Sequence, residues 1–313
     1  MSHSPIRMTI VAASAVLLAS CAAQVRVVGP PVYVAPPPPP PTVVAAGPGY
    51  VVQVRVAPPP LPVYDQPPCP VVGWMWTPGY WAWGPDGYYW VPGTWVAPPR
   101  IGVLWTPGYW GFVGGAYVWH VGYWGPHVGF YGGVNYGFGY VGVGFAGGRW
   151  VGNSFAYNRS VTNVTNVHVT NVYNETVINN TSVTRVSYNG GAGGTRAVPT
   201  AAERTAEREP HTQPTPAQQR HIQQAQRNPA LSAKANGGRP SIAATPRPAA
   251  FNAPGVAHAR GANPSIERAS MRRENREGQP SAHANAGSQH PKAKGKQGKK
   301  PHNKGEKQQK QQS

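Results

Sequence analysis

The chain has 313 residues, with 38 Gly, 37 Pro, only 12% charged residues and a formal net charge of +18. Glycine and proline make up about a quarter of the chain without a collagen period, which is typical of extensive low-complexity sequence. This composition excludes a protein built from several large globular domains. We expect one small ordered domain in the middle of the chain.

Residues 1–21 have the features of a bacterial lipoprotein signal peptide. The apolar run from Met8 to Ala19 has 12 residues, which is too short to span a bilayer and suits a signal peptide. It leads into Leu18-Ala19-Ser20-Cys21, which resembles a lipobox, where the peptidase cuts before the Cys and the Cys is lipidated. The alternative is an ordinary signal peptide followed by an incidental Cys. Because Ala22 rather than Asp follows, resemblance to Gram-negative sorting predicts an outer-membrane lipoprotein, on either its periplasmic or its surface side.

Residues 22–73 form a proline-rich segment that we predict to be an extended spacer. Prolines run without interruption from Pro36 to Pro41 and recur at Pro58 to Pro60, and such sequence favours polyproline II. The alternative is a proline motif that binds a partner's aromatic groove. If Cys21 is lipidated, Cys69 is the only thiol left, which excludes an intramolecular disulfide. We interpret Cys69 as a bystander, with a Cys-linked dimer as the alternative.

A Trp-x-x-Gly-x-Trp hexamer occurs four times between Trp74 and Trp124. The copies begin 14, 15 and 14 residues apart, so the repeating unit is a pair of hexamers with a period of 29 residues. Three copies have Pro-Gly at their centre, which favours a type II turn and would place the two tryptophans of one hexamer opposite each other. Further turns at 84–87 and 113–116 would link these hairpins into an antiparallel meander. The hexamer tryptophans are Trp76, Trp81, Trp90, Trp95, Trp105, Trp110, Trp119 and Trp124.

Alternation along such strands gathers the tryptophans on one face. That face has two possible roles. It is either a core, in which indole packs on indole, or an exposed platform for sugar rings or planar ligands. We favour the core, because each aromatic side chain buries about 150–250 Å² and so many exposed indoles would make the surface adhesive.

Two segments after the hexamers extend the predicted β-domain to residues 74–188. Gly125 to Trp150 is rich in glycine and aromatics, which favours strands over a flexible glycine-rich loop. Asn153 to Tyr188 alternates valine with Thr and Asn, and its β-branched content predicts strands. Its valines are mostly three residues apart, so a strand pair, a solenoid-like coil and a self-associating segment all remain open. The predicted fold class is mostly β, a small antiparallel Trp-rich meander with long disordered regions.

Residues 189–313 contain no Trp or Tyr, 21 Lys and Arg, and 7 Asp and Glu. Such a segment buries too little apolar surface to offset the entropy of ordering it, so we predict a disordered basic tail with short helices possible at 201–209 and 217–227. Its charge suits anionic envelope polymers, lipopolysaccharide or peptidoglycan, and simple solvation is the alternative. We do not expect nucleic acid as a partner, because the predicted signal peptide would export the chain.

The candidate ordered region offers few groups for chemistry. Between Ala22 and Tyr188 the only acidic residues are Asp65, Asp86 and Glu175, and no phosphate-binding, dinucleotide or nucleophile motif is present. The histidines of this region are scattered without the spacing of a zinc site; they are His120, His127 and His168. We therefore predict that the protein is not an enzyme and has no catalytic, cofactor-binding or metal site.

The hexamers Trp-Thr-Pro-Gly-Tyr-Trp and Trp-Val-Pro-Gly-Thr-Trp resemble the bacterial YXWGXW (WXXGXW) repeat proteins. The resemblance covers about residues 73–188 and includes the stretches 132–140 and 171–177. The copy at Tyr80 to Gly84 is degenerate, because Pro85 follows and no Trp stands two residues after Gly84. The family consists largely of exported lipoproteins and other envelope proteins of uncharacterised role. The resemblance implies a non-enzymatic structural or interaction role, with binding of a glycan or another ligand by the Trp face and basic tail as the alternative.

Overall fold

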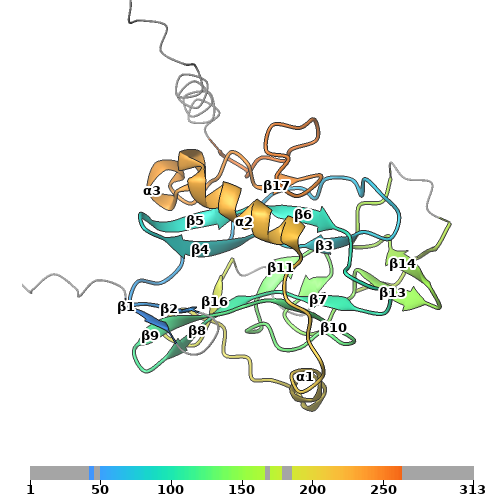
Figure 1. Ribbon diagram of the computed structural model, residues 1–313, viewed down its shortest axis with the longest axis horizontal. Coiled ribbons are helices and arrows are strands. Elements are labelled where there is room, and N and C mark those ends of the chain that lie inside the picture. The colour runs from blue at the N-terminus through green and yellow to red at the C-terminus, as the bar shows by residue number, and fades with distance from the viewer. Residues whose placement is uncertain (1–41, 46–49, 166–169, 178–184, 263–313) are drawn as a thin grey trace, which may run out of the picture. The chain divides into compact units, whose positions relative to one another are not determined.

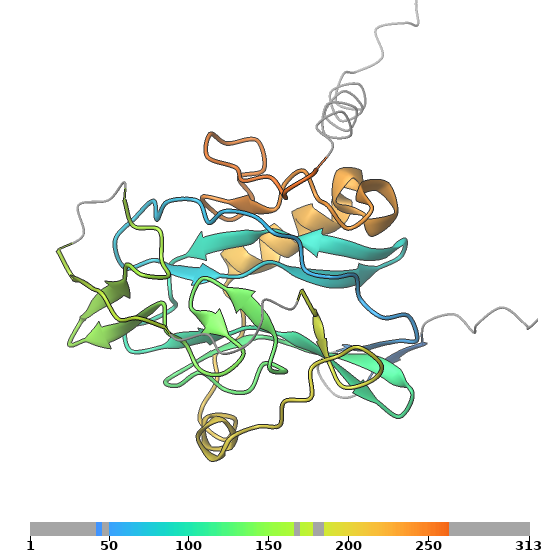
Figure 2. The same ribbon diagram turned by 180° about the vertical axis from the view of Figure 1, so that it is seen from behind.

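The computed structural model describes residues 42–45, 50–165, 170–177 and 185–262, which Figures 1 and 2 show from opposite sides. The predicted signal peptide with Cys21, the run from Pro36 to Pro41, and the part of the predicted tail from residue 263 onward lie outside the described residues. Within them the fold is mostly β, in small and mainly antiparallel sheets, with three α-helices, which confirms the predicted fold class. No helix in this part of the chain is long and apolar enough to cross a membrane.

The first repeat folds as one long hairpin with two broken strands. One strand consists of β3 (Met75–Thr77) and β4 (Tyr80–Gly84), and the other of β5 (Gly87–Val91) and β6 (Gly93–Val96). β3 pairs with β6 and β4 pairs with β5, and both strands advance by three residues across the break, so the register is kept. Trp76 therefore lies opposite Trp95, and Trp81 lies opposite Trp90.

The second repeat forms a second long hairpin with the same plan. Its strands are β7 (Leu104–Thr106) with β8 (Tyr109–Val113), and β9 (Ala116–His120) with β10 (Tyr123–Gly125). Trp105 lies opposite Trp124, and Trp110 lies opposite Trp119. Each hexamer thus runs along one strand and faces another hexamer across the hairpin.

The Pro-Gly pairs do not form the hairpin turns that the sequence predicted. They lie in the strand breaks, and their glycines lack the positive φ that the second central position of a type II turn needs. The hairpins turn instead at Pro85-Asp86 and Gly114-Gly115, which confirms the second set of predicted turns. Gly114 and Gly115 have φ of 58° and 84°, and positive φ at both positions suits the type I′ turn that matches strand twist.

Glycine is required at the centre of each hexamer by the first tryptophan of the hexamer opposite. A Cβ atom on Gly79 would lie 2.3 Å from Cζ2 of Trp90, and a Cβ atom on Gly93 would lie 2.6 Å from Cζ2 of Trp76. No side chain fits at these separations, so only glycine lets the indole lie over the facing backbone. The second hairpin repeats both contacts, at 2.5 Å for Gly108 with Trp119 and 2.6 Å for Gly122 with Trp105.

The two long hairpins pack against each other, one above the other in Figure 1. Trp110 of the second hairpin donates its Nε1–H to the backbone carbonyl of Trp81 in the first, at 2.7 Å. Tyr80 stacks on Trp119, with 4.8 Å between ring centroids and 16° between ring planes. The repeats are therefore joined by direct contacts between aromatic residues of their motifs.

The glycine-aromatic segment after the hairpins is ordered, as the sequence predicted, and it joins the two repeats. It contains the short strands β11 (Asn135–Gly137) and β12 (Tyr140–Val141). The hydroxyl of Tyr140 lies 3.3 Å from the carbonyl oxygen of Trp76 and 3.0 Å from that of Trp105. These two tryptophans open equivalent hexamers, so one phenol bridges the same point of both repeats.

Short strands from distant parts of the chain complete the sheets. In one sheet the order is β1-β2-β9-β8-β16, and in another it is β17-β6-β3. A third sheet has the order β13-β14-β15, and both β14 and β15 lie in the Asn/Val-rich segment 153–188. The bounds are β1 Thr42–Ala45, β2 Tyr50–Val54, β13 Gly148–Val151, β14 Ser154–Asn158, β15 Val172–Tyr173, β16 Tyr188–Asn189 and β17 Ala244–Thr245. Val167, His168 and Val169 lie outside the described residues.

The predicted spacer is wrong for its described part: β1 and β2 join the sheet of the second hairpin through β9, and residues 57–73 pack on the first long hairpin. Leu61, Tyr64 and Cys69 are buried there. The carbonyl of Pro60 accepts the Nε1–H of Trp81 at 3.2 Å, and the carbonyl of Pro67 accepts that of Trp95 at 2.8 Å. Extended proline-rich backbone has carbonyls that no ladder uses, and buried indoles need such acceptors.

The predicted disorder is also wrong for residues 189–262. This segment forms α1 (Ala201–Ala206), α2 (Pro216–Arg227), a 3₁₀ turn (Pro229–Leu231) and α3 (Ala233–Asn236). Its buried hydrophobic residues are small or aliphatic, Ala225, Leu231, Ile242, Ala243 and Ala244 among them. Alanine-rich backbone comes close to the hairpins and offers carbonyls to them: that of Ala243 accepts the Nε1–H of Trp90 at 2.9 Å. The segment orders because it covers a core that the hairpins provide.

Candidate functional site

The hexamer tryptophans are the core of the domain. Seven of the eight are buried and Trp119 is half-buried; six of the buried ones, all but Trp105, are at most 1% exposed. They pack as cross-strand pairs with ring centroids 5.2–5.4 Å apart, and such tilted or edge-to-face pairs contribute about 0.5–1.5 kcal/mol each beyond burial. The pairs are Trp76 with Trp95, Trp81 with Trp90, Trp105 with Trp124 and Trp110 with Trp119.

A cavity of about 290 Å³ lies between the two long hairpins and is closed on one side by α2. The first hairpin lines it with paired residues, Tyr80 opposite Val91 and Ala82 opposite Tyr89. The second hairpin supplies three tryptophans and the glycines of its strand breaks. They are Trp105, Trp110, Trp119, Gly108 and Gly122. The sequence did not reveal this cavity, because its walls come from both repeats and from a segment predicted to be disordered.

Helix α2 closes the cavity by binding both hairpins. Gln218 accepts the Nε1–H of Trp124 at 2.9 Å and also caps the helix, since its side-chain oxygen accepts the backbone N–H of Thr215 at 2.8 Å. One turn further on, His221 lies 2.8 Å from the carbonyl oxygen of Pro92 in the first hairpin. Gln218 and His221 thus fix the helix to the second and first repeat respectively.

His221 is a buried, neutral histidine with both ring nitrogens engaged. The backbone N–H of Ala249 donates to Nδ1 at 2.9 Å. Since Nδ1 accepts, Nε2 carries the proton and donates it to Pro92. Burial lowers the pKa of His221 to about 4. The neutral ring therefore keeps both hydrogen bonds at neutral pH. Sequence reasoning missed this residue because it lies in the predicted tail.

The cavity is uncharged at neutral pH. No Lys, Arg, Asp or Glu lines it among the residues that the structure describes. Burial raises the pKa of Tyr89 to about 12, and burial with the neighbouring phenols of Tyr89 and Tyr136 raises the pKa of Tyr80. Apolar and aromatic walls with a few polar groups are typical of sites for small molecules. This cavity suits a small neutral ligand.

Cys69 is a buried thiol. Its Sγ lies 3.1 Å from the carbonyl oxygen of Val71, to which it donates. Burial raises the pKa of the Cys69 thiol, so the thiolate is disfavoured and the group is unreactive. A Cys-linked dimer would first require this part of the core to open.

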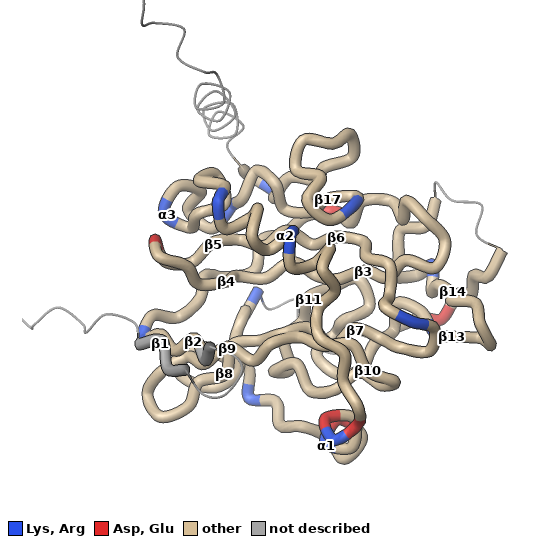
Figure 3. Tube along the Cα trace, in the orientation of Figure 1, with Lys and Arg blue, Asp and Glu red and all other residues tan. Residues whose placement is uncertain are grey.

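The few acidic residues and histidines of the candidate ordered region, which are scattered in the sequence, also lie apart in the structure. His127 pairs with Glu209 at 2.7 Å, Arg260 pairs with Asp65 at 3.4 Å, and Asp86 lies in a hairpin turn. Within the described residues, no three His, Cys, Asp or Glu side chains are placed to hold a metal ion. Figure 3 shows acidic residues gathered at α1 and basic ones along the segment that carries α2 and α3.

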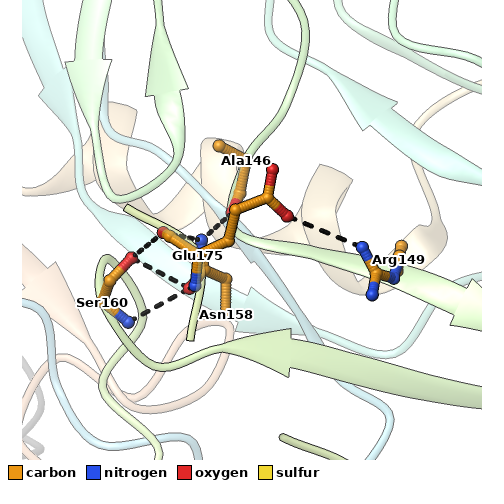
Figure 4. Close-up of polar contacts among 5 residues, drawn as sticks. All are labelled: Ala146, Arg149, Asn158, Ser160 and Glu175. Atoms are coloured by element: carbon orange, nitrogen blue, oxygen red, sulfur yellow. Dashed lines mark hydrogen bonds and ion pairs between the residues drawn. The ribbon is translucent and has the colours of Figure 1, made fainter. Parts of the chain in front are cut away.

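Asn158 opens an Asn-Arg-Ser sequence but serves as a structural hub (Figure 4). It is 1% exposed, and its amide nitrogen donates to the carbonyls of Ala146 and Glu175, both at 3.0 Å. Its side-chain oxygen accepts from the backbone of Glu175 and from the hydroxyl of Ser160. Arg149 pairs with the Glu175 carboxylate at 3.6 Å and lies over the ring of Tyr173. The cluster ties β13 and β14 to the part of the chain at and just after β15.

Comparison with known families finds the WXXGXW repeat in two copies, at residues 72–96 and 100–124. Each copy coincides with one long hairpin, so the repeating unit of sequence is also the unit of structure. No curated protein and no solved structure matches the chain.

Proposed function

We propose that this chain, whose core consists of WXXGXW repeats, is a non-enzymatic lipoprotein of the cell envelope with a structural or interaction role. The observation that carries this role is that the buried side chains serve the fold itself. The indoles of the repeats pack on one another, and the buried polar groups of Asn158, Gln218 and His221 bind other parts of the same chain. The repeats build a packed core, and the surface of the domain is left for contacts.

The proposed location depends on the first 21 residues. Leu18-Ala19-Ser20-Cys21 supports lipidation of Cys21, and Ala22 in place of Asp supports transport to the outer membrane. A multiply acylated cysteine is a stable anchor, unlike a single acyl chain. The basic carboxy-terminal sequence supports contact with anionic envelope polymers.

Metabolic labelling with a palmitate analogue tests the anchor. We expect label and membrane association in the wild type, loss of both in Cys21→Ala, and no change in Cys69→Ala, the control that removes the only other thiol. Label that persists in Cys21→Ala contradicts the proposal.

Co-sedimentation of the full chain with purified sacculi, or with vesicles that contain lipopolysaccharide, tests the interaction role. We expect association that weakens as salt is raised. No association with either, at low salt, contradicts the proposed partners.

The cavity between the hairpins favours a second candidate function, binding of a small neutral ligand. Its volume of about 290 Å³ is close to the lower end of ligand pockets, about 300–1,000 Å³. A neutral fluorescent probe such as N-phenyl-1-naphthylamine tests it. We expect saturable binding that is lost in Ala82→Phe, which fills the cavity, and kept in Val198→Phe, where the valine is 78% exposed. Binding that Ala82→Phe leaves intact places the probe elsewhere and rejects this function.

A further inference from the structure

A second groove, of about 470 Å³, lies at the start of α2 and shares no lining residue with the cavity between the hairpins. Its walls are the first turns of α2, the two ends of the first long hairpin and the loop after β17, and they include Arg220, Arg247 and Trp74. We propose that this groove binds a phosphate-bearing sugar, whose phosphate is held by the two guanidinium groups and whose ring lies against the indole. The assignment rests on the proposed interaction role but not on lipidation of Cys21.

The groove is positively charged without compensation. Arg220 and Arg247 are exposed and form no hydrogen bond or ion pair through their side chains with any described residue. No acidic residue lines the groove, and residues 210–262 contain no Asp or Glu. A phosphate monoester carries about −1.5 to −2 charges at pH 7, which matches two guanidinium groups. Arginine also binds phosphate oxygens through two parallel hydrogen bonds.

Trp74 differs from seven of the eight hexamer tryptophans in being only half-buried. It precedes the first hexamer and is only partly buried. Its backbone is nevertheless fixed, because its carbonyl accepts the hydroxyl of Tyr157 at 2.8 Å and its N–H donates to the carbonyl of Val71 at 3.2 Å. A partly exposed indole on a fixed backbone offers a flat apolar surface beside the two cations. An indole beside two cations favours a ligand whose ring carries an anionic group over an anion that has no ring.

The loop that carries Arg247 is held in a strained shape. Ala249 has φ of +64°, a left-handed conformation that non-glycine residues rarely adopt. The strain is held by the bond from the Ala249 N–H to Nδ1 of His221, and the hydroxyl of Thr245 donates to the carbonyl of Arg247 at 2.9 Å. His221 follows Arg220 on α2, so the helix that presents one arginine also fixes the loop of the other. A groove fixed in this way loses little entropy when it binds.

Calorimetric titration of the full chain in detergent with glucose 6-phosphate tests the proposal. We expect saturable binding of glucose 6-phosphate, weaker binding of inorganic phosphate and none of glucose. Arg220→Gln and Arg247→Gln should each weaken binding by about 10- to 100-fold, the usual effect of losing a hydrogen bond to a charged group. Arg227→Gln is the matched control, since Arg227 lies on the same helix but does not line the groove. Its affinity should equal that of the wild type.

Trp74→Ala separates the two halves of the site. It should weaken binding of glucose 6-phosphate and leave binding of inorganic phosphate unchanged. No saturable binding of glucose 6-phosphate overturns the proposal, and so does an equal loss in Arg227→Gln, which would indicate diffuse charge. Equal affinity for inorganic phosphate and glucose 6-phosphate overturns the role of the indole. Failure of Cys21 labelling would reject the anchor and leave this site standing.

Discussion

Trp110 donates its indole N–H to the backbone carbonyl of Trp81 over 2.7 Å, and the two residues, 29 positions apart, close equivalent hexamers of successive repeats. The period of the sequence is therefore also a physical contact between repeats. Tyr140 follows the same period, because its hydroxyl reaches the carbonyls of Trp76 and Trp105, which open equivalent hexamers. The second hairpin docks on the first through the motif itself.

Replacing Trp110 by Phe should destabilise the domain clearly. The change removes the donor and leaves the buried carbonyl of Trp81 unsatisfied, which costs about 1–3 kcal/mol, and the smaller ring adds a packing loss. Urea unfolding followed by far-UV circular dichroism measures the free energy of unfolding. Trp83→Phe is the control, because Trp83 is only partly buried and its indole nitrogen has no hydrogen-bond partner among the described residues. Equal losses in the two variants would show that the bond between the repeats contributes nothing.

The central glycine of a hexamer should not tolerate even a methyl group. In Gly79→Ala the new Cβ would lie 2.3 Å from Cζ2 of Trp90 and 2.8 Å from the nitrogen of Gly93. The indole or the facing strand must move, and we expect a loss of about 1–3 kcal/mol, as for other overpacked cores. Gly125→Ala is the control, since its nearest contact would be an ordinary 3.4 Å. The same unfolding measurement decides, and a stable Gly79→Ala would contradict the packing explanation of the motif.

Stability should fall when the pH drops below about 6.5, the ordinary pKa of histidine. Burial lowers the pKa of His221 to about 4 in the folded protein. Between these values the unfolded chain takes up a proton that the folded one does not, so the free energy of unfolding decreases by up to about 3 kcal/mol. Above pH 6.5 this group has no effect. Unfolding midpoints from pH 7 to pH 4 measure the slope. His221→Gln keeps a donor and an acceptor and should flatten it; an unchanged slope would assign the effect to other groups.

Intrinsic tryptophan fluorescence should report a closed core. In the full chain we expect blue-shifted emission that iodide quenches poorly, because seven hexamer indoles are buried. Deleting the residues after Gly190 removes the acceptors of Trp90 and Trp124, which Ala243 and Gln218 supply. We expect that deletion to shift emission to the red and to increase quenching. If emission and quenching stay the same, the carboxy-terminal segment is dispensable for the core.

The sequence predicted the repeat, its period and the β class, because these follow from local patterns of Trp, Gly and turn residues. It misplaced the hairpin turns, since Pro-Gly fits a turn locally and only the facing hexamer shows why the glycine is there. That contact, between Gly79 and Trp90 for example, depends on pairing across the hairpin.

The sequence did not reveal that residues 57–73 and 189–262 cover the core, for a different reason. We call these two stretches the covering segments. Pro60, Pro67 and Ala243 contribute backbone carbonyls to buried indoles, and any residue type carries such a carbonyl. Composition reports apolar area and charge, so it made these segments look like a spacer and a disordered tail. Both candidate sites lie where a covering segment meets a hairpin, and for that reason neither was visible from motifs.

The bond from Trp90 to Ala243 joins residues 153 positions apart. A chain that leaves a ribosome or threads a pore with its amino terminus first presents both hairpins long before Ala243 arrives. The indole N–H of Trp90 therefore lacks this acceptor until nearly 250 residues have emerged. Contacts of such long range also slow folding. The order of residues along this chain therefore delays closure of the domain until the segment with Ala243 is available.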